Sequence, residues 1–367
     1  MTPIILSGSR AGQILSYVLT EIIVLLSVLQ MFLTASVPAL KIFQIPVEIL
    51  LGVFLIIGCL TIKHSRSHAL LIIIFVTVTV LSLVNVSVSI FMVAAKQHGL
   101  AVLALLYFSK RCHKSTLIPI VVLATLSLLL MNFFSPKSVA AYINLASDTD
   151  FNNSRFGGVF LNVHFNAFFL ATALIYYSYK THLFGIGFLI ITITASKFIL
   201  VSYVGNQIGK LRVFQYLSKS QVVRICILAL SFAIFLINSQ EIISFFDSEP
   251  FGLSLNSASV ILMQLADPVY YTIMLNPLPS DVISVSDRAL ALYPGHDGYI
   301  EVGYFALASR SGIFFGGLYL FFLLRKAFYF RIFILLGLLH LNYIFSPLII
   351  YMFLTYSKEI KIILAKK

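Results

Sequence analysis

The chain has 367 residues, of which 60% are hydrophobic and only 10% are charged, and its formal net charge is +12. A soluble domain carries about a quarter charged residues, so this composition excludes an ordinary soluble protein. The positive charge does not indicate nucleic-acid binding, because the Lys and Arg residues are scattered in short segments between apolar runs, where membrane-orientation signals lie.

Apolar runs that are long enough to cross a bilayer follow one another along most of the chain. A helix needs ~20 apolar residues to span the hydrocarbon core, and lipid offers no partner for open backbone groups. The sequence therefore predicts an all-α polytopic membrane protein with about 12 transmembrane helices, or as few as about 10. The predicted spans are 12–35, 46–62, 69–89, 91–108, 117–135, 159–179, 183–195, 196–209, 225–240, 303–324, 329–346 and 347–357.

Two of these divisions are open. The stretch 69–108 has one weak interruption, at Lys96-Gln97-His98, and its turn lies there, earlier or later. The stretch 183–209 is a continuous apolar block that hydropathy alone reads as a single tilted helix. The alternative is a hairpin of two short helices that turns near Ala195-Ser196-Lys197.

Charge parity favours the hairpin. The basic clusters at 63–66, 110–114, 210–224 and 325–331 and the Lys-rich tail are expected to face the cytoplasm. An even number of crossings must then separate each pair of clusters, which requires the turn near 195–197. Both termini then lie inside, as do all but seven of the 25 basic residues. The seven are Lys41, Lys96, Lys137, Arg155, Lys197, Arg288 and Arg310.

This topology divides the chain into alternating membrane and exported parts, with the acidic residues concentrated in the longer exported loop. The parts are N-terminal transmembrane helices (1–135), an exported loop (136–158), transmembrane helices with the hairpin (159–240), a large exported loop (241–302), and C-terminal transmembrane helices with a basic cytoplasmic tail (303–367).

The densest polar constellation opens the span predicted at 159–179. Arg155 precedes two glycines, so a guanidinium and backbone N–H groups can meet one anion, aided by the helix dipole. Asn162 and Asn166 are four residues apart and share a helix face, which makes both amides candidates for binding a sugar or a phosphate. The alternative is an interfacial anchoring arginine with polar helix–helix contacts.

Two further cations lie within apolar sequence. Lys197 costs ~3 kcal/mol or more there unless it snorkels or is paired, so it is either a second cation of an anion site or a snorkelling lysine. Arg310 lies two turns into an apolar helix and is harder to explain structurally. The nearby Gly312, Gly316 and Gly317 are typical of close helix packing.

His296 is the only histidine in the large loop and follows the turn sequence Pro294-Gly295. Asp297 and Glu301 are candidates to orient it, and a histidine beside a carboxylate is typical of a general base. A solvated loop histidine is the alternative. No zinc signature, phosphate-cradling glycine loop or paired-aspartate motif is present, so we expect no metal and no cofactor.

Several other polar residues have simpler interpretations. Glu21 in the first span is either functional or hydrogen-bonded between helices. Four further histidines are expected to be loop residues without partners: His64, His68, His98 and His113.

The constellations together are similar to the O-antigen polymerase/ligase superfamily, and fit best its O-antigen polymerases (Wzy-type). The resemblance covers about residues 150–325, in the order Arg155, Gly158, Asn162, Asn166, Ser196-Lys197 and His296 ahead of a glycine-containing helix group. The family's Asn-Pro-Asn-like string appears here as 162–166, its Ser-Arg as Ser196-Lys197, which loses bidentate geometry, and its His-Asn as His296-Asp297.

The resemblance implies a GT-C-like fold and an enzyme, a glycosyltransferase, on the periplasmic face of a bacterial inner membrane. The donor would be a growing chain on polyprenyl pyrophosphate, and the acceptor a lipid-linked repeat unit. His296 would be the base, while Arg155 and Lys197, with Arg288 and Arg310, would stabilise the departing pyrophosphate without metal. A chain-length regulator and a flippase are the expected protein partners. A ligase to lipid A-core and a lipid-linked oligosaccharide flippase are the alternatives.

Overall fold

The structure is a computed structural model that describes residues 10–85, 87–111, 113–145, 158–180, 197–210, 264, 275–279, 302–339 and 343–366. These residues form α-helices and short 3-10 turns, with no β-strand among them. Five helices are long and apolar enough to cross a membrane: Gly12–Thr34, Pro38–Leu60, Arg66–Leu83, Leu117–Phe134 and Gly303–Lys326. The described residues thus have the architecture of an α-helical membrane protein, while a total of about 12 spans and a GT-C-like fold stay predictions.

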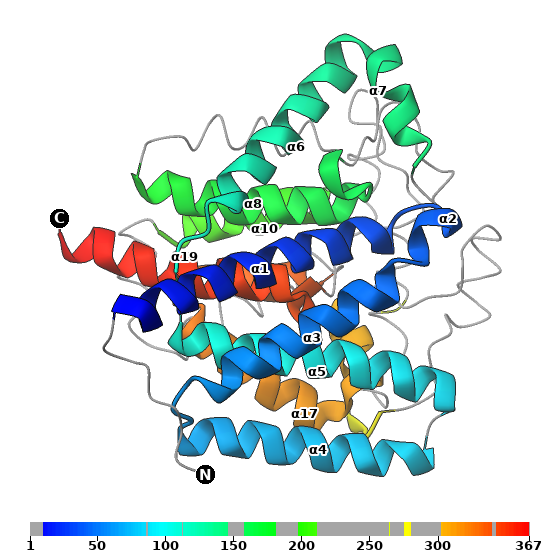
Figure 1. The fold of residues 1–367 in the computed structure, drawn as a ribbon, viewed down its shortest axis with the longest axis vertical. Coiled ribbons are helices and arrows are strands. Elements are labelled where there is room, and N and C mark those ends of the chain that lie inside the picture. The colour runs from blue at the N-terminus through cyan, green and yellow to red at the C-terminus, as the bar shows by residue number, and fades with distance from the viewer. Residues whose placement is uncertain are drawn as a thin grey trace, which may run out of the picture.

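The N-terminal part runs back and forth through a helical bundle, and α6 with α7 projects from it at the top of Figure 1. Its elements are α1 (Arg10–Thr34), α2 (Pro38–Lys41), α3 (Gln44–Leu60), α4 (Arg66–Asn85), α5 (Val88–Lys110), α6 (Leu117–Phe134) and α7 (Pro136–Ile143). The turn within 69–108 lies between Asn85 and Val88, earlier than the weak interruption, so Lys96 and His98 lie inside α5.

The C-terminal part contains shorter and more irregular elements. They are η1 (Gly158–Phe160), α8 (Val163–Lys180), α10 (Lys197–Ile208), α17 (Gly303–Lys326), η2 (Phe328–Phe330), α18 (Arg331–Gly337), η3 (Tyr343–Phe345) and α19 (Pro347–Ala365). The span predicted at 329–346 is wrong, because α18 has only 7 residues and extends roughly 10 Å. By contrast, α19 continues well past the predicted end at 357.

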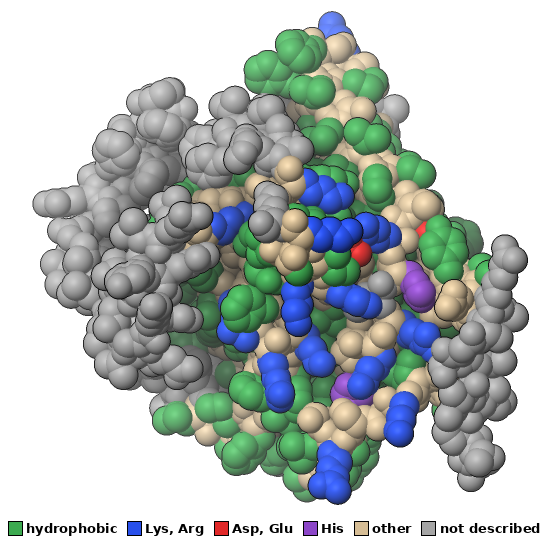
Figure 2. Space-filling view, turned by 90° about the vertical axis from the view of Figure 1, so that its left-hand side faces the viewer, with side chains coloured by type: hydrophobic (Ala, Val, Ile, Leu, Met, Phe, Trp, Pro, Cys, Tyr) green, Lys and Arg blue, Asp and Glu red, His purple; other side chains and the backbone are tan. Residues whose placement is uncertain are grey.

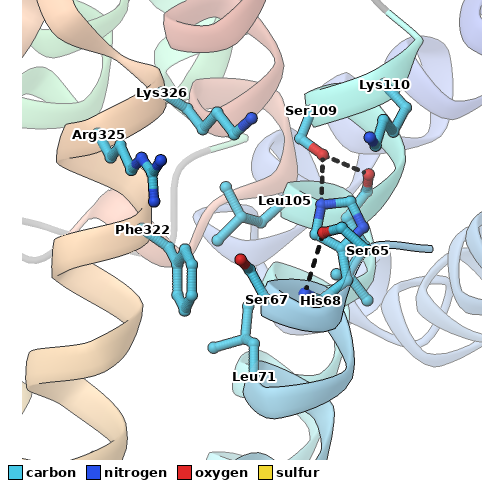
Figure 3. Close-up of a pocket in the computed structure, with 11 residues that line it drawn as sticks. Ser65, Ser67, His68, Leu71, Leu105, Ser109, Lys110, Phe322, Arg325 and Lys326 are labelled. Atoms are coloured by element: carbon cyan, nitrogen blue, oxygen red, sulfur yellow. Dashed lines mark hydrogen bonds between the residues drawn. The ribbon is translucent and has the colours of Figure 1, made fainter.

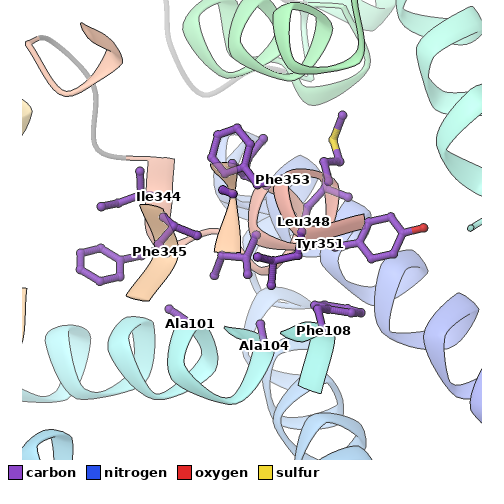
Figure 4. Close-up of a cluster of buried hydrophobic side chains, with 14 of the residues drawn as sticks. Ala101, Ala104, Phe108, Ile344, Phe345, Leu348, Tyr351 and Phe353 are labelled. Atoms are coloured by element: carbon purple, nitrogen blue, oxygen red, sulfur yellow. The ribbon is translucent and has the colours of Figure 1, made fainter. Parts of the chain in front are cut away.

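Helix α19 forms the centre of the described bundle. It packs against α1, α5 and α8, and every residue from Pro347 to Ser357 is buried. On the facing side of α5, Ala101 and Ala104 are fully buried (Figure 4), and such small residues allow two helix backbones to approach closely. This packing, rather than contact with lipid, explains why the first part of α19, Pro347–Ser357, has no charged side chain on any face.

The helices at the outside of the bundle expose apolar faces. On α3, Ile45 and Ile49 are 65% and 60% exposed, and on α6, Leu123 and Phe133 are 64% and 66% exposed. A soluble protein rarely exposes continuous apolar patches of this kind. These faces are therefore the surfaces that contact lipid if the bundle spans a bilayer.

Basic residues from well-separated segments gather at one end of the bundle, which Figure 2 shows face on. We call this end the basic end. The basic end is formed by the α3–α4 loop, the α5–α6 loop and the C-terminal ends of α8, α17 and α19, whose residues contact or interact electrostatically with one another. Its described basic residues include Lys63, Arg66, Lys110, Arg111, Lys114, Lys180, Lys210, Arg325, Lys326 and Lys358.

The opposite end of the bundle is formed by the α1–α2 corner and the end of α7, where the Val37 backbone N–H donates to the Leu145 carbonyl at 2.8 Å. Helices α8 and α10 both finish at the basic end, because Lys210 Nζ donates to Ser178 Oγ at 2.6 Å. Helix α10 covers most of the helix predicted at 196–209 and runs toward the basic end, while the predicted turn near 195–197 stays a prediction. The helix predicted at 183–195 lies outside the described residues, as does that at 225–240.

Glu21 anchors α1 to the start of α6. Its carboxylate accepts hydrogen bonds from Ser115 Oγ at 2.6 Å and from the Thr116 backbone N–H at 2.7 Å. A carboxylate at a helix N-terminus is stabilised by the unpaired N–H groups and the helix dipole there. The structure thus gives Glu21 an interhelical role.

His113 lies in the loop between α5 and α6 and connects it to α1, with Nε2 3.0 Å from Ser16 Oγ. Burial lowers the pKa of His113 below its ordinary value of 6.5, and the neighbouring Arg111 and Lys358 lower it further. The unfolded chain therefore binds this proton at a higher pH than the folded chain does.

The free energy of unfolding should consequently fall as the pH is lowered through about 6.5. We expect His113→Asn to remove part of this loss, so that its unfolding temperature depends less on pH than that of the unaltered protein between pH of about 7 and 5. Thermal unfolding of both proteins across that range checks this, and identical pH slopes would contradict it.

Candidate functional site

Helix α17 is broken in its first half at Gly312, whose φ of 66° and ψ of 157° are not helical. The segment 275–279 packs into the break, and the Asn276 carbonyl accepts a hydrogen bond of 3.0 Å from the Ile313 N–H. A Cβ on Gly312 would lie only 2.4 Å from the Pro277 carbonyl oxygen. Only glycine therefore permits this close approach between α17 and the inserted segment.

Two polar side chains meet beside the break. His98 of α5 is buried, and its Nε2 lies 3.0 Å from Ser311 Oγ of α17. The imidazole also contacts the ring of Phe345, at 4.5 Å between ring centroids. The interpretation of His98 as a loop residue without partners is wrong, because α5 continues through it and faces α17 there. The others have partners too: His64 meets the Cys59 carbonyl, and His68 meets Ser109.

Arg310 lies one residue before this pair and is largely buried, as the sequence predicted for a cation within an apolar helix. The described residues contain three carboxylates, and each has other partners: Glu21 binds Ser115 and Thr116, Glu48 binds Lys96, and Glu359 binds Lys114. None of the three lies within ion-pair distance of Arg310. A largely buried guanidinium that pairs with none of the described carboxylates is suited to binding an anion.

The turn η3 connects this region to the predicted asparagines. The Tyr319 hydroxyl donates to the Ile344 carbonyl at 2.6 Å and so holds η3 against α17. Tyr343, the first residue of η3, donates from its hydroxyl to Asn162 Oδ1 at 3.2 Å. Asn162 and His98, the partner of Ser311, therefore both contact η3, through Tyr343 and Phe345.

Both predicted asparagines also serve the local fold. Asn162 Oδ1 accepts from the Phe165 N–H at 2.8 Å, which is an N-cap for α8. Asn166 is 1% exposed; its Nδ2 donates to the Asn162 carbonyl at 2.7 Å, and its Oδ1 lies beneath Gly158. These bonds hold the tight turn at η1, where Gly158 has a φ of 65°. A substrate-binding role for either asparagine stays a prediction.

An ion pair lies on another side of α5, toward α3. Lys96 Nζ is 2.8 Å from Glu48 Oε2, and the side chains are 40% and 5% exposed. Gln44 Nε2 also donates to Glu48 Oε1, at 2.8 Å. The predicted topology counts Lys96 among the basic residues of the exported side, and the structure places it within α5, in an ion pair with a buried carboxylate.

These groups share one depth in the bundle. Arg310, His98 and Asn166 precede the basic residues at the ends of α17, α5 and α8 by 12 to 15 positions, which is roughly 20 Å along a helix. We call this level the polar layer; its residues are Glu48, Lys96, His98, Asn162, Asn166, Arg310, Ser311 and Tyr343. It lies in the half of a ~30 Å hydrocarbon core that is farther from the basic end.

Most other predicted site residues fall outside the described residues, namely Arg155, Arg288, His296, Asp297 and Glu301. Lys197 is the first described residue of α10, and its side chain lies outside the described part of the structure. Their proximity to the polar layer therefore stays a prediction.

The sequence interpretation missed three features: the contact of His98 with Ser311, the ion pair of Glu48 with Lys96, and the break at Gly312. A signal was present for the ion pair, because Glu48 and Lys96 are both charged residues within or beside apolar runs and charges at such depth are usually paired. No local signal links His98 to Ser311, which are 213 positions apart.

Comparisons with known proteins give this chain no relative: no protein-family model, no curated protein and no solved structure matches it.

Proposed function

We propose that this chain is a membrane glycosyltransferase that polymerises O-antigen (surface polysaccharide) repeat units, transferring the growing chain from polyprenyl pyrophosphate to a lipid-linked repeat unit. The reaction class comes from the sequence resemblance across residues 150–325. The structural observation that supports it is Arg310, a largely buried cation beside a helix break with no described carboxylate as partner.

The chemistry of the donor explains why such a cation is needed. Breaking the bond between the sugar and the lipid pyrophosphate leaves negative charge on the departing phosphate oxygens. A fixed guanidinium in a dry site stabilises this developing charge more strongly than water does. In our proposal Arg310 acts with Arg155, Lys197 and Arg288 on the pyrophosphate, while His296 removes the proton from the acceptor hydroxyl.

The proposed orientation follows from the inside-positive rule. The basic end would face the cytoplasm of a bacterial inner membrane, and the polar layer would then lie in the outer half of the bilayer. Lipid-linked sugars that have already been exported could reach it from the periplasm. The cations would substitute for a metal ion, so the proposal includes no cofactor.

A transporter of lipid-linked oligosaccharides is the second candidate, and the broken helix α17 favours it. Discontinuous helices with polar residues at membrane depth are typical of secondary transporters. A transporter moves its substrate without lengthening it, so the two functions differ in their products. A ligase is a closer alternative, which a deletion strain separates: without a polymerase the core carries one repeat unit, and without a ligase it carries none.

We predict that Arg310→Ala abolishes the ladder of glycan lengths when it replaces the unaltered chain in a deletion strain. Loss of one group that stabilises transition-state charge typically lowers the rate ~10²–10³-fold. Arg310→Lys should restore a weak ladder, because it keeps the charge but not the bidentate geometry.

Arg66→Ala is the matched control, because it removes an exposed arginine at the basic end. It should give a full ladder. The amount of each variant in the membrane must be equal, and a full ladder from Arg310→Ala at normal abundance would contradict the proposal.

A further inference from the structure

A cavity of about 100 Å³ opens at the basic end, where α4, α5 and α17 meet (Figure 3). It lies roughly 20 Å along α17 from Arg310 and is separate from the polar layer. Its wall contains one histidine, three cations, three hydroxyl groups and four apolar side chains. These are Ser65, Ser67, His68, Leu71, Leu105, Leu106, Ser109, Lys110, Phe322, Arg325 and Lys326.

The cavity is positively charged and no described acid neutralises it. The three described carboxylates, Glu21, Glu48 and Glu359, each have partners elsewhere. Neither Lys110 nor Arg325 lies within ion-pair distance of any of them. Arg325 and Lys326 extend from α17 into the space between the helices (Figure 3). Like charges that converge on one cavity are favourable when an anion lies between them.

The neutral groups in the wall add hydrogen-bonding capacity. Ser109 Oγ donates to the Leu106 carbonyl at 2.9 Å, so its bond of 3.1 Å with His68 Nε2 requires the imidazole to be the donor. The second ring nitrogen, His68 Nδ1, is buried and has no partner. With Nε2 as the donor, Nδ1 is an acceptor and cannot bond a phosphate oxygen, so this atom fits a hydroxyl donor, such as a headgroup hydroxyl or a water, beside the phosphate.

The cavity is also amphipathic along the bundle axis. Each helix contributes a polar residue near its end and an apolar residue one turn deeper on the same face: His68 and Leu71, Lys110 and Leu106, Arg325 and Phe322. The mouth is therefore cationic and the floor apolar. A small free anion has no apolar part that could contact the floor of the cavity. A phospholipid, by contrast, carries its phosphate directly above its glycerol and acyl groups.

We infer that this cavity binds a phosphate group, supplied by the headgroup of an anionic phospholipid. The volume is several times that needed by one water molecule, and basic cavities between membrane helices at the inside-positive face are suited to anionic headgroups. The proposal does not depend on the enzymatic function, because none of the lining residues belongs to the polar layer.

Thermal unfolding of the purified full-length protein in detergent tests this site. We expect phosphatidylglycerol to raise the unfolding temperature in a saturable way, whereas phosphatidylcholine should not. Inorganic phosphate is the third probe and distinguishes the sources: an equal effect at equal concentration would overturn the lipid assignment and leave a site for the free anion. No difference between phosphatidylglycerol and phosphatidylcholine would overturn the site itself.

Two variants locate the binding. Lys110→Gln/Arg325→Gln should weaken the apparent affinity for phosphatidylglycerol about tenfold or more, and Ser67→Leu should weaken it by filling the cavity without changing charge. Lys361→Gln/Lys366→Gln is the matched control, because it removes two exposed cations outside the cavity, one in α19 and one directly after it. It should change the affinity less than about twofold. An equal loss in the control would show binding by general charge and contradict the cavity.

Discussion

Replacing Gly312 by alanine should abolish the activity of the protein and lower its unfolding temperature more than any other alanine substitution of a glycine in α17. The backbone conformation, with a φ of 66° and a ψ of 157°, alone costs an L-residue roughly 1–3 kcal/mol. In addition, the new Cβ would lie 2.4 Å from the Pro277 carbonyl oxygen and 2.9 Å from the Leu278 backbone. These are backbone atoms, so relief requires the inserted segment to move away from α17.

Gly317 provides the control on the same helix. A Cβ there meets no atom within 4 Å, and alanine is favoured over glycine inside a helix by roughly 0.5–1 kcal/mol. Gly317→Ala should therefore keep activity and unfold at the same or a slightly higher temperature. The unfolding temperatures of both variants, measured in detergent and compared with that of the unaltered protein, test this prediction. If Gly312→Ala kept the activity and the unfolding temperature of Gly317→Ala, the break in α17 would be required neither for activity nor for stability.

The second large effect is expected at the ion pair of α3 and α5. Lys96→Met leaves the carboxylate of Glu48 without its cation, and this carboxylate is 5% exposed. Removing one partner of a buried pair typically costs ~3–5 kcal/mol. We expect about 3 kcal/mol, at the lower end of that range, because the Lys96 side chain is 40% exposed.

A double variant separates the charge from the packing. In Lys96→Met/Glu48→Gln no charge remains buried, and the amide oxygen at position 48 can still accept from Gln44. This variant should recover most of the lost stability, since replacing both members of a buried pair is often nearly neutral. Denaturant unfolding of the three proteins measures this, and equal losses in the single and double variants would show that packing, not charge, is responsible.

The sequence predicted most of the described helices because lipid-facing helices are apolar along a length that the bilayer sets. The ranges expected for α1, α3, α4, α5, α6 and α8 agree with the structure within a few residues. The same signal failed at 329–346, where α18 ends at Gly337 and buries Phe333 and Ile334 in the protein. Hydropathy cannot distinguish a residue that is apolar because it contacts lipid from one that contacts other helices.

The site was predictable only where a residue conflicts with its local surroundings. Arg310 stands out in the sequence because a cation in an apolar helix is costly, and the structure keeps it largely buried. Gly312 was interpreted as a small residue for packing, since its φ of 66° depends on the contact with Pro277 more than 30 positions away. His98 likewise depends on α17 and η3 for its surroundings. Such long-range pairings leave no periodic pattern.

The central claim, polymerisation by a membrane glycosyltransferase, is tested most directly in proteoliposomes that contain the purified chain and lipid-linked repeat units from the deletion strain. Without an ion gradient or nucleotide sugar, the unaltered chain should convert the repeat units into a ladder of longer lipid-linked glycans. Arg310→Ala should leave them as single units. Movement of the units across the bilayer without lengthening would instead establish a transporter and contradict our account.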